Sequence, residues 1–271
     1  MRPAPVTEIF ENLKRFFVFA QPSPALDEYV EFFAESSASQ FVSTGDKDVF
    51  TCRMFPSYTP TFFINLTGHY KLQLDGAKFS IEARQDILLL RDTSVQRINS
   101  PGDNIFTVKF HAGTLRQLFD IAPAQINGGF MTLDNFIPRG LLKAIRTAGS
   151  FAERVELMSD YLQEKAHNRS AGFNGQLVDR ALNDQRYPED RTAVYEIAAS
   201  LHVSSKTLTR YFVRELGVSP KRYFSVIRFR KALNDYLHNN RTFHPFDYGY
   251  YDHSHFSREV LRFTGKRLKQ Q

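Results

Sequence analysis

The sequence contains a single cysteine, Cys52, among its 271 residues. One cysteine cannot form an internal disulfide, which excludes a disulfide-stapled fold and agrees with a reducing compartment. No stretch approaches the roughly 20 consecutive apolar residues that a membrane-spanning helix needs. The first 21 residues mix charges into their apolar run and lack a small-residue cleavage site, so they do not resemble a secretion signal. These absences lead us to expect a cytoplasmic protein in which Cys52 is a small core residue.

The charge of the chain is unevenly distributed. Hydrophobic residues make up 42% and charged residues 24%, which is typical of a folded globular protein. Residues 1–169 carry 18 Lys and Arg against 19 Asp and Glu, whereas residues 170–271 carry 17 against 10, a net charge of +7. A basic second part joined to a near-neutral first part indicates that the second part meets a polyanion such as a nucleic acid.

Short strand-like runs fill the region from about Lys47 to Phe110. Residues 62–66, 70–74, 87–90 and 105–110 are rich in β-branched, leucine and aromatic residues, and turn residues separate them. In the second run apolar and polar residues alternate, and Asp75-Gly76 follows directly, a pattern typical of a β-hairpin. Short strands at this close spacing favour an antiparallel barrel or sandwich.

The hydrophobic period becomes helical from about Pro138 to Lys165, which predicts two helices with a break near Gly149. We expect this pair to form a homodimer interface, although packing on the strand region would use the same side chains. The apolar residues concerned are Leu141, Leu142, Ile145, Val155, Met158 and Leu162. Residues 164–174 are polar and are predicted to be a linker, with helices from there to the end.

A helix-turn-helix pattern occupies residues 194–217. Ser204 is placed to cap the second helix of the pattern. Leu208 and Phe212 lie four residues apart and are predicted to point inward together, and Gly217 ends the helix. The opposite side presents the residues that we expect to meet a DNA major groove, namely Ser205, Lys206, Thr209 and Arg210. A helical hairpin that only packs is the alternative interpretation of this pattern.

A second, similar pattern follows a long helix that begins at Ser219-Pro220. Asp252 is placed to cap a helix whose inner face holds Phe256 and Val260. The outward residues, which are the expected DNA contacts of this second unit, are His253, Ser254, Ser257 and Arg258. A bridging helix of about 20 residues spans roughly 30 Å, close to the ~34 Å turn of B-DNA, so both units could enter successive major grooves.

These two blocks closely resemble the AraC/XylS family of transcription regulators over roughly residues 177–265. The most specific piece is the glycine-aromatic-x-Asp-x-Ser-His-Phe-x-Arg string, present as residues 249–258. The family's positions in the first unit are matched by Ile197-Ala198, Ser204, Leu208-Thr209-Arg210-Tyr211-Phe212 and Gly217-Val218-Ser219-Pro220. The resemblance implies a sequence-specific regulator that binds double-stranded DNA, with RNA polymerase as a further partner.

The second unit departs from the family in two places. His244-Pro245 stands where the family usually has an Ile-Ala pair. Because proline removes a hydrogen bond and clashes with the preceding turn, the first helix of this unit should be short, begin at Pro245 or be distorted. The closing Gly265-Lys266-Arg267-Leu268 also differs from the family's Gly-x-Ser/Thr-Pro. We therefore expect the second unit to bind DNA more weakly or less specifically than the first.

The patterns and the resemblance together predict an α+β chain with three parts. Residues 1–135 are expected to form a cupin-like antiparallel β-barrel that binds a small-molecule effector, and residues 136–168 the helical pair. Residues 170–271 are expected to form an all-α double helix-turn-helix domain. Phenylalanines of the strand region either fill its core or surround an apolar effector; they are Phe50, Phe55, Phe62, Phe63, Phe79 and Phe106. Whether the protein activates or represses stays open.

Two alternatives belong to other classes of protein. A cupin enzyme needs a His-x-His pair on a strand with a carboxylate and another histidine, and the strand region offers only His69 and His111. His253 and His255 have the spacing, but on a helix their side chains diverge by about 200°, so His255 is expected to make a structural hydrogen bond. Without a nucleophile elbow or phosphate-binding glycine loop, we expect no enzyme activity, metal or cofactor. The other alternative, favoured by His244-Pro245, is a cupin-type interaction or ligand-binding module with weak DNA affinity.

Overall fold

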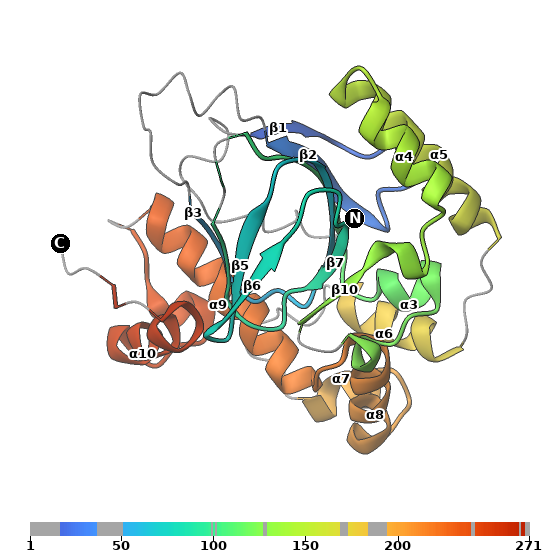
Figure 1. The fold of residues 1–271 in the computed structure, drawn as a ribbon. Helices are drawn as coiled ribbons and strands as arrows, with labels where there is room; N and C mark the ends of the chain where they lie inside the picture. Colours follow the sequence, from blue (N-terminus) through green and yellow to red (C-terminus); the bar gives the residue numbers. More distant parts are fainter. Residues whose placement is uncertain are drawn as a thin grey trace.

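The computed structural model describes residues 17–36, 51–98, 100, 102–126, 129–168, 173–183, 194–239, 242–265 and 267–268. The architecture is α+β, with strands in the N-terminal half of the chain and helices in the remainder (Figure 1). Among the described residues, no helix has both the length and the apolar character needed to cross a membrane.

The described strands form two antiparallel sheets. The six-stranded sheet has the order β1-β2-β9-β4-β7-β10 and the four-stranded sheet the order β3-β8-β5-β6. The strands of the larger sheet are β1 (Phe17–Ala20), β2 (Val30–Ser36), β4 (Pro60–Thr67), β7 (Ile87–Leu90), β9 (Asn104–Phe110) and β10 (Phe130–Thr132). Those of the smaller sheet are β3 (Thr51–Met54), β5 (Tyr70–Leu74), β6 (Ala77–Ile81) and β8 (Val95–Ile98). The predicted antiparallel strand domain is confirmed, although its described strands form two separate sheets and not the single closed barrel that was expected.

The hairpin predicted from sequence joins β5 to β6. Leu74 pairs with Ala77, which leaves Asp75 and Gly76 as a two-residue turn. Both turn residues have positive φ, 46° and 85°, the conformation that matches the right-handed twist of the two strands. Aspartate and glycine tolerate this conformation better than most residues, which is why the dipeptide predicts the hairpin.

The larger sheet is covered on both faces. On one face Phe63, Leu89 and Ile105 belong to a buried cluster shared with Tyr70 and Leu72 of the smaller sheet. On the other face, residues such as Phe33 and Phe106 belong to a cluster shared with helices. A sheet buried on both sides needs nearly continuous apolar strands, and β4 is indeed buried at its first six positions.

Helices α3 (Thr114–Phe119), α4 (Arg139–Thr147) and α5 (Phe151–His167) cover that second face, with short 3-10 turns η1 (Pro123–Gln125) and η3 (Leu133–Asn135) between strands and helices. The predicted helical pair and its break are confirmed. Leu142, Ile145, Met158 and Leu162 are at most 1% exposed and pack against the sheet. The alternative use predicted for these side chains, packing on the strand region, is therefore the one observed, and a homodimer through this helical pair stays a prediction.

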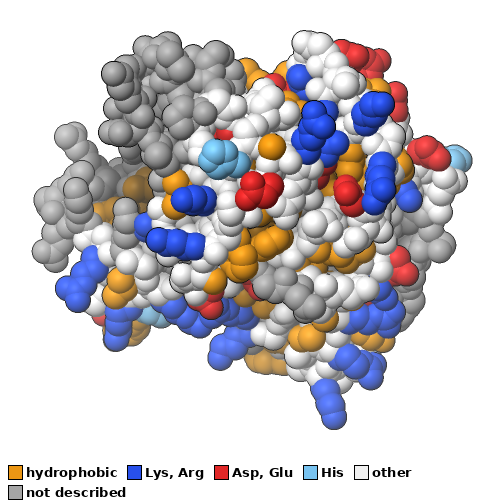
Figure 2. All heavy atoms as spheres, viewed as in Figure 1, with side chains coloured by type: hydrophobic (Ala, Val, Ile, Leu, Met, Phe, Trp, Pro, Cys, Tyr) orange, Lys and Arg blue, Asp and Glu red, His pale blue; other side chains and the backbone are white. Residues whose placement is uncertain are grey.

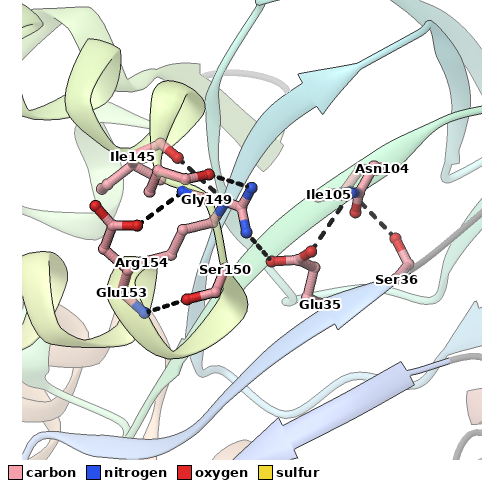
Figure 3. Close-up of polar contacts among 10 residues, drawn as sticks. Glu35, Ser36, Asn104, Ile105, Ile145, Gly149, Ser150, Glu153 and Arg154 are labelled. Atoms are coloured by element: carbon pink, nitrogen blue, oxygen red, sulfur yellow. Dashed lines mark hydrogen bonds and ion pairs between the residues drawn. The ribbon is translucent and has the colours of Figure 1, made fainter.

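Arg154 ties the turn between α4 and α5 to the sheet (Figure 3). Its Nε donates to the carbonyl of Ile145 at 3.1 Å and its Nη2 to that of Ala148 at 2.9 Å. Its Nη1 lies 3.3 Å from Oε2 of Glu35 in β2. The carbonyls at the end of α4 have no partner within the helix, so this one side chain satisfies two of them and fixes the helical pair on the sheet.

The described C-terminal helices are α6 (Phe173–Asn183), α7 (Val194–Ser200), α8 (Ser205–Leu216), α9 (Pro220–His238), the 3-10 turn η4 (Pro245–Tyr248) and α10 (His253–Thr264). They surround one buried cluster that includes Leu208, Phe212 and Phe229. Tyr58, from the strand domain, belongs to the same cluster. The helical part of the chain therefore packs directly on the strand domain.

Candidate nucleic-acid interface

The first helix-turn-helix unit has the local structure that its sequence predicts. The Ser204 hydroxyl accepts a hydrogen bond from the backbone N–H of Thr207 at 3.1 Å and so caps α8. Leu208 and Phe212 are fully buried, and Gly217 ends the helix with a φ of 73°, which glycine adopts without strain. Capping at both ends and a buried inner stripe fix which face of α8 points outward.

The outward face of α8 carries the residues predicted to contact DNA. Ser205, Lys206 and Arg210 are exposed and Thr209 is half-buried. The Arg210 guanidinium lies 5.4 Å from the centre of the Tyr211 ring, a cation–π distance that restrains the side chain. The structure thus brings all four predicted residues together on one helix face.

The second unit has an intact recognition helix and an altered supporting segment. Asp252 caps α10 by accepting from the backbone N–H of His255 at 2.6 Å, and Phe256 and Val260 are buried beneath the helix. The segment that begins at Pro245 is a single 3-10 turn, η4. The short or distorted helix predicted from His244-Pro245 is therefore confirmed, and the recognition helix beside it keeps its full length.

The outward face of α10 carries the second set of predicted residues. His253, Ser254 and Arg258 are exposed and Ser257 is half-buried. His255 has the structural role predicted for it, since its Nδ1 accepts from the backbone N–H of Tyr251 at 3.3 Å. Arg262 and Arg267, two of the basic residues around the end of α10, are exposed, whereas Lys266 and Lys269 lie outside the described residues.

Helix α9 separates the two recognition helices. It has 19 residues, which corresponds to about 28 Å at 1.5 Å per residue. Helix α8 contacts the first turns of α9 through Phe212 and Tyr223. Helix α10 runs along α9, with Phe256 against Tyr236 and Phe263 against Phe229. Lys and Arg side chains crowd the lower part of the visible face, over the region of these helices (Figure 2). This spacing and charge suit two adjacent major grooves of a duplex.

A buried polar cluster around Glu259 was not predicted from sequence. Glu259 is 8% exposed and its carboxylate accepts from Tyr250 Oη at 2.5 Å, Arg228 Nη2 at 3.1 Å and Ser225 Oγ at 3.1 Å. Burial, followed by the hydrogen bond with Glu259, raises the pKa of Tyr250 well above its usual range. The cluster joins α10 to α9 and to the turn before α10. A carboxylate on the buried stripe with Phe256 and Val260 is the sequence signal that could have revealed it.

The strand domain contacts α9 through the segment between β3 and β4. The guanidinium Nε of Arg222 donates to the Tyr58 hydroxyl at 3.1 Å. Arg230, which is 2% exposed, donates from Nη1 to the carbonyls of Phe55 and Pro56, both at 3.4 Å. These arginines lie on the helix that spaces the two recognition helices, so the strand domain contacts the helical part of the chain between its two helix-turn-helix units.

Further contacts reach both recognition helices. Near the end of α10, Arg53 donates to the carbonyl of Thr264 at 3.2 Å and Ser94 to that of Phe263 at 2.7 Å. At the other unit, Arg116 of α3 lies 4.0 Å from Glu215 of α8. The strand domain is thus attached to both helix-turn-helix units.

The histidines of the strand domain are far from a metal-binding arrangement. His69 is exposed and His111 half-buried. Within the described ranges, no three His, Cys, Asp or Glu residues lie close enough together to hold a metal ion.

Comparison with known proteins identifies the helical part. Residues 197–270 match the family model described as "Helix-turn-helix domain". No curated protein matches the chain by sequence. Among solved structures, ToxT from Vibrio cholerae has a TM-score of 0.45 at 12% identity, over 81% of this chain and 95% of that one. The Cupin_2 domain of an XRE family transcriptional regulator from Enterobacter cloacae has a TM-score of 0.26 at 12% identity, over 35% of this chain and 95% of that domain.

The family match covers the part of the chain in which two capped units flank α9. Each unit presents an exposed recognition helix. The recognition segments of both units resemble the AraC/XylS pattern, whereas the second unit departs from it at His244-Pro245 and after Gly265. The C-terminal part of this chain is therefore a helix-turn-helix domain of the AraC type.

Proposed function

We propose that this protein regulates transcription by inserting α8 and α10 into successive major grooves of double-stranded DNA. The observation that carries the proposal is the pair of capped helices with exposed polar faces, separated by the 19 residues of α9. Ser205, Lys206, Thr209 and Arg210 would contact the first groove, and His253, Ser254, Ser257 and Arg258 the second. A regulator acts where the DNA lies, so we place it in the cytoplasm, without an enzymatic step.

Within this proposal the two units differ in what they contribute. Arg210 is exposed on an unaltered unit and can donate two hydrogen bonds to O6 and N7 of a guanine. The second unit has its supporting helix reduced to the turn η4, while Arg262 and Arg267 are exposed near its end. The first unit would therefore supply most base discrimination, and the second mainly salt-sensitive affinity for phosphates.

The N-terminal domain would control DNA binding through its contacts with the helices. Arg222 and Arg230 of α9 are held by the segment around Tyr58, so a change in the strand domain would alter how the two units sit on DNA. A small-molecule effector in the strand domain is the proposed trigger. RNA polymerase and a second copy of the chain are further proposed partners, the latter through the outer faces of α4 and α5.

Selection of bound duplexes from a random DNA pool, followed by electrophoretic shift, tests the proposal. The expected result is a recovered motif with two conserved blocks about one helical turn, 10–10.5 base pairs, apart. The same electrophoretic shift with random duplex at low salt separates this proposal from the alternative, an interaction or ligand-binding module with weak DNA affinity. A module that has lost DNA affinity would recover no motif and would shift neither duplex.

A further inference from the structure

A cavity lies between the two sheets of the strand domain. Its walls are built from alternate residues of several strands, because alternate side chains of a strand point to the same face. The larger sheet contributes Phe17, Phe19, Phe32, Ala34, Thr61, Phe63, Thr107 and Lys109, with Arg91 directly after its strand β7, and the smaller sheet contributes Cys52, Met54 and Arg97. These residues include three cations and no carboxylate. The cavity is therefore lined mainly by apolar side chains, and the charged side chains of its lining are all cations.

Arg97 is the most unusual of these side chains. It is 2% exposed, and its guanidinium lies between two aromatic rings, 5.3 Å from the centre of Phe17 and 5.4 Å from that of Phe63. Its Nε and Nη2 have no hydrogen-bond partner among the residues that the structure describes. Asp103 acts on it electrostatically without an ion pair. Burying a charge with unfilled hydrogen-bonding positions is unfavourable, so these positions are suited to an incoming anion.

Other polar groups of the cavity point to the same ligand chemistry. The hydroxyls of Thr61 and Thr107 are buried and, within the described part of the chain, lack a hydrogen-bond partner. The ammonium of Lys109 lies 3.3 Å from the Glu31 carboxylate, and Arg91 donates to the Thr59 hydroxyl at 3.3 Å. Lys109 and Arg91 are thus held in place, while Arg97 and the two threonines keep hydrogen-bonding capacity.

The size of the cavity limits the ligand. The open space amounts to about 50 Å³. A single water molecule needs roughly 10–15 Å³ of such space. This space can hold a carboxylate and part of a short apolar body, and the rest of that body would reach the rim at Phe19, which is 36% exposed. A long chain would not fit without displacing the phenylalanines.

We propose that this cavity binds a small monocarboxylate. The carboxylate would take a paired hydrogen bond from the Arg97 guanidinium, whose planar fork matches its geometry, and further bonds from Thr61 and Thr107. The apolar body would lie against the rings of Phe17, Phe32 and Phe63. The inference names the effector class of the strand domain, and its regulatory consequence rests on the proposed function.

The same elements connect the cavity to the DNA-binding helices. Cys52 and Met54 face the cavity, while Arg53 between them reaches the end of α10. Arg91 faces the cavity with its side chain, and its carbonyl accepts from the backbone N–H groups of Ser57 and Tyr58 at 2.9 and 3.0 Å. A ligand that shifts these residues would move the segment that holds α9. It can change DNA binding only by the difference between its affinities for the two arrangements of that segment.

Isothermal titration calorimetry of the full chain tests the site with hexanoate, benzoate, hexanol and hexadecanoate. Hexanoate or benzoate should bind with one saturable site at a Kd between about 1 μM and 1 mM, and hexanol should not. Arg97→Gln should weaken binding about tenfold or more, whereas the control Arg139→Gln, an exposed arginine on α4, should not change it. Thr107→Val leaves Arg97 in place and removes one hydroxyl of the cavity, so it should weaken binding by a smaller factor. This second variant keeps the test valid if Arg97→Gln does not fold.

Three results would overturn the inference. They are no binding by either small carboxylate, equal binding of hexanol, and binding by hexadecanoate alone. An electrophoretic shift on the selected duplex is run with the same protein. If the chain binds DNA but no carboxylate, the inference is contradicted and the proposed function stands. If it binds a carboxylate but no DNA, the proposed function is contradicted and the carboxylate site stands.

Discussion

The Arg222 guanidinium of α9 donates to the Tyr58 hydroxyl at 3.1 Å, and these two residues are 164 positions apart in the chain. Their hydrogen bond joins the strand domain to the helix that spaces the two recognition helices. Tyr58 is 6% exposed and has a φ of 53°, an uncommon conformation for a bulky residue. The surrounding packing holds this backbone in place and so sets how α9 meets the strand domain.

Removal of that hydroxyl should weaken the attachment of the two domains. Tyr58→Phe leaves the ring in the shared cluster and removes one hydrogen bond to a charged group, so the unfolding free energy should fall by roughly 1–3 kcal/mol. Urea denaturation of the full chain measures the change. Tyr195→Phe, at a 64% exposed tyrosine, is the control and should have little effect. Equal loss in both variants would show that the contact between the domains contributes nothing specific.

Arg210→Ala should reduce base discrimination. The side chain is exposed on the outward face of α8, and loss of a bidentate contact to guanine costs about 1–3 kcal/mol and relaxes preference at one base pair. Binding to the selected duplex and to single-base variants of it measures this. Uniform weakening on every sequence would mean that Arg210 contacts only phosphate.

The Glu259 cluster should position α10. Glu259→Gln keeps the shape of the side chain but removes the charge beneath Arg228 and the strong acceptor for Tyr250. Because Arg228 is partly exposed, we expect a loss of about 1–3 kcal/mol rather than the larger cost of a fully buried pair. Thermal unfolding measures the stability, and DNA binding at matched folded fraction measures the position of α10. Unchanged stability would show that the cluster is not a structural anchor.

Asp86 should make stability depend on pH. Burial raises the pKa of its carboxyl from 3.8 to about 6, although the N–H of Asn65 and the guanidinium of Arg146 act against that rise. A carboxyl with a raised pKa in the folded state binds more protons folded than unfolded, so its stabilising contribution is lost as pH rises from about 4 through about 6. Asp86→Asn removes this titration, and its unfolding free energy should fall less over that range than that of the wild type. Parallel curves for both proteins would contradict the assignment.

The sequence predicts the helical half well, because its signals are local. Ser204, Asp252 and Gly217 act on the turn in which they lie, and the Asp75-Gly76 hairpin needs only its own two strands. The proline turn η4 could be predicted for the same reason, since Pro245 changes the backbone at its own position.

The strand domain is harder to predict, because several of its interior residues are charged. In β2, Glu31 and Glu35 are buried with partners on other elements, Lys109 and Arg154. Arg97 likewise stands where alternation would predict an apolar residue. The contacts between the domains join residues more than 150 positions apart, such as Arg53 and Thr264, and no periodicity in the sequence marks such pairs.

The most direct test of the account compares two triple variants on the selected duplex and on random duplex, over a series of salt concentrations. Alanine replaces Lys206, Thr209 and Arg210 in one variant, and His253, Ser254 and Arg258 in the other. If α8 reads bases and α10 mainly contacts phosphates, the first variant loses its preference for the selected duplex. The second then keeps that preference, with lower affinity and a shallower salt dependence. A second variant that loses preference more severely than the first would contradict this division, and unchanged binding by both would contradict the interface itself.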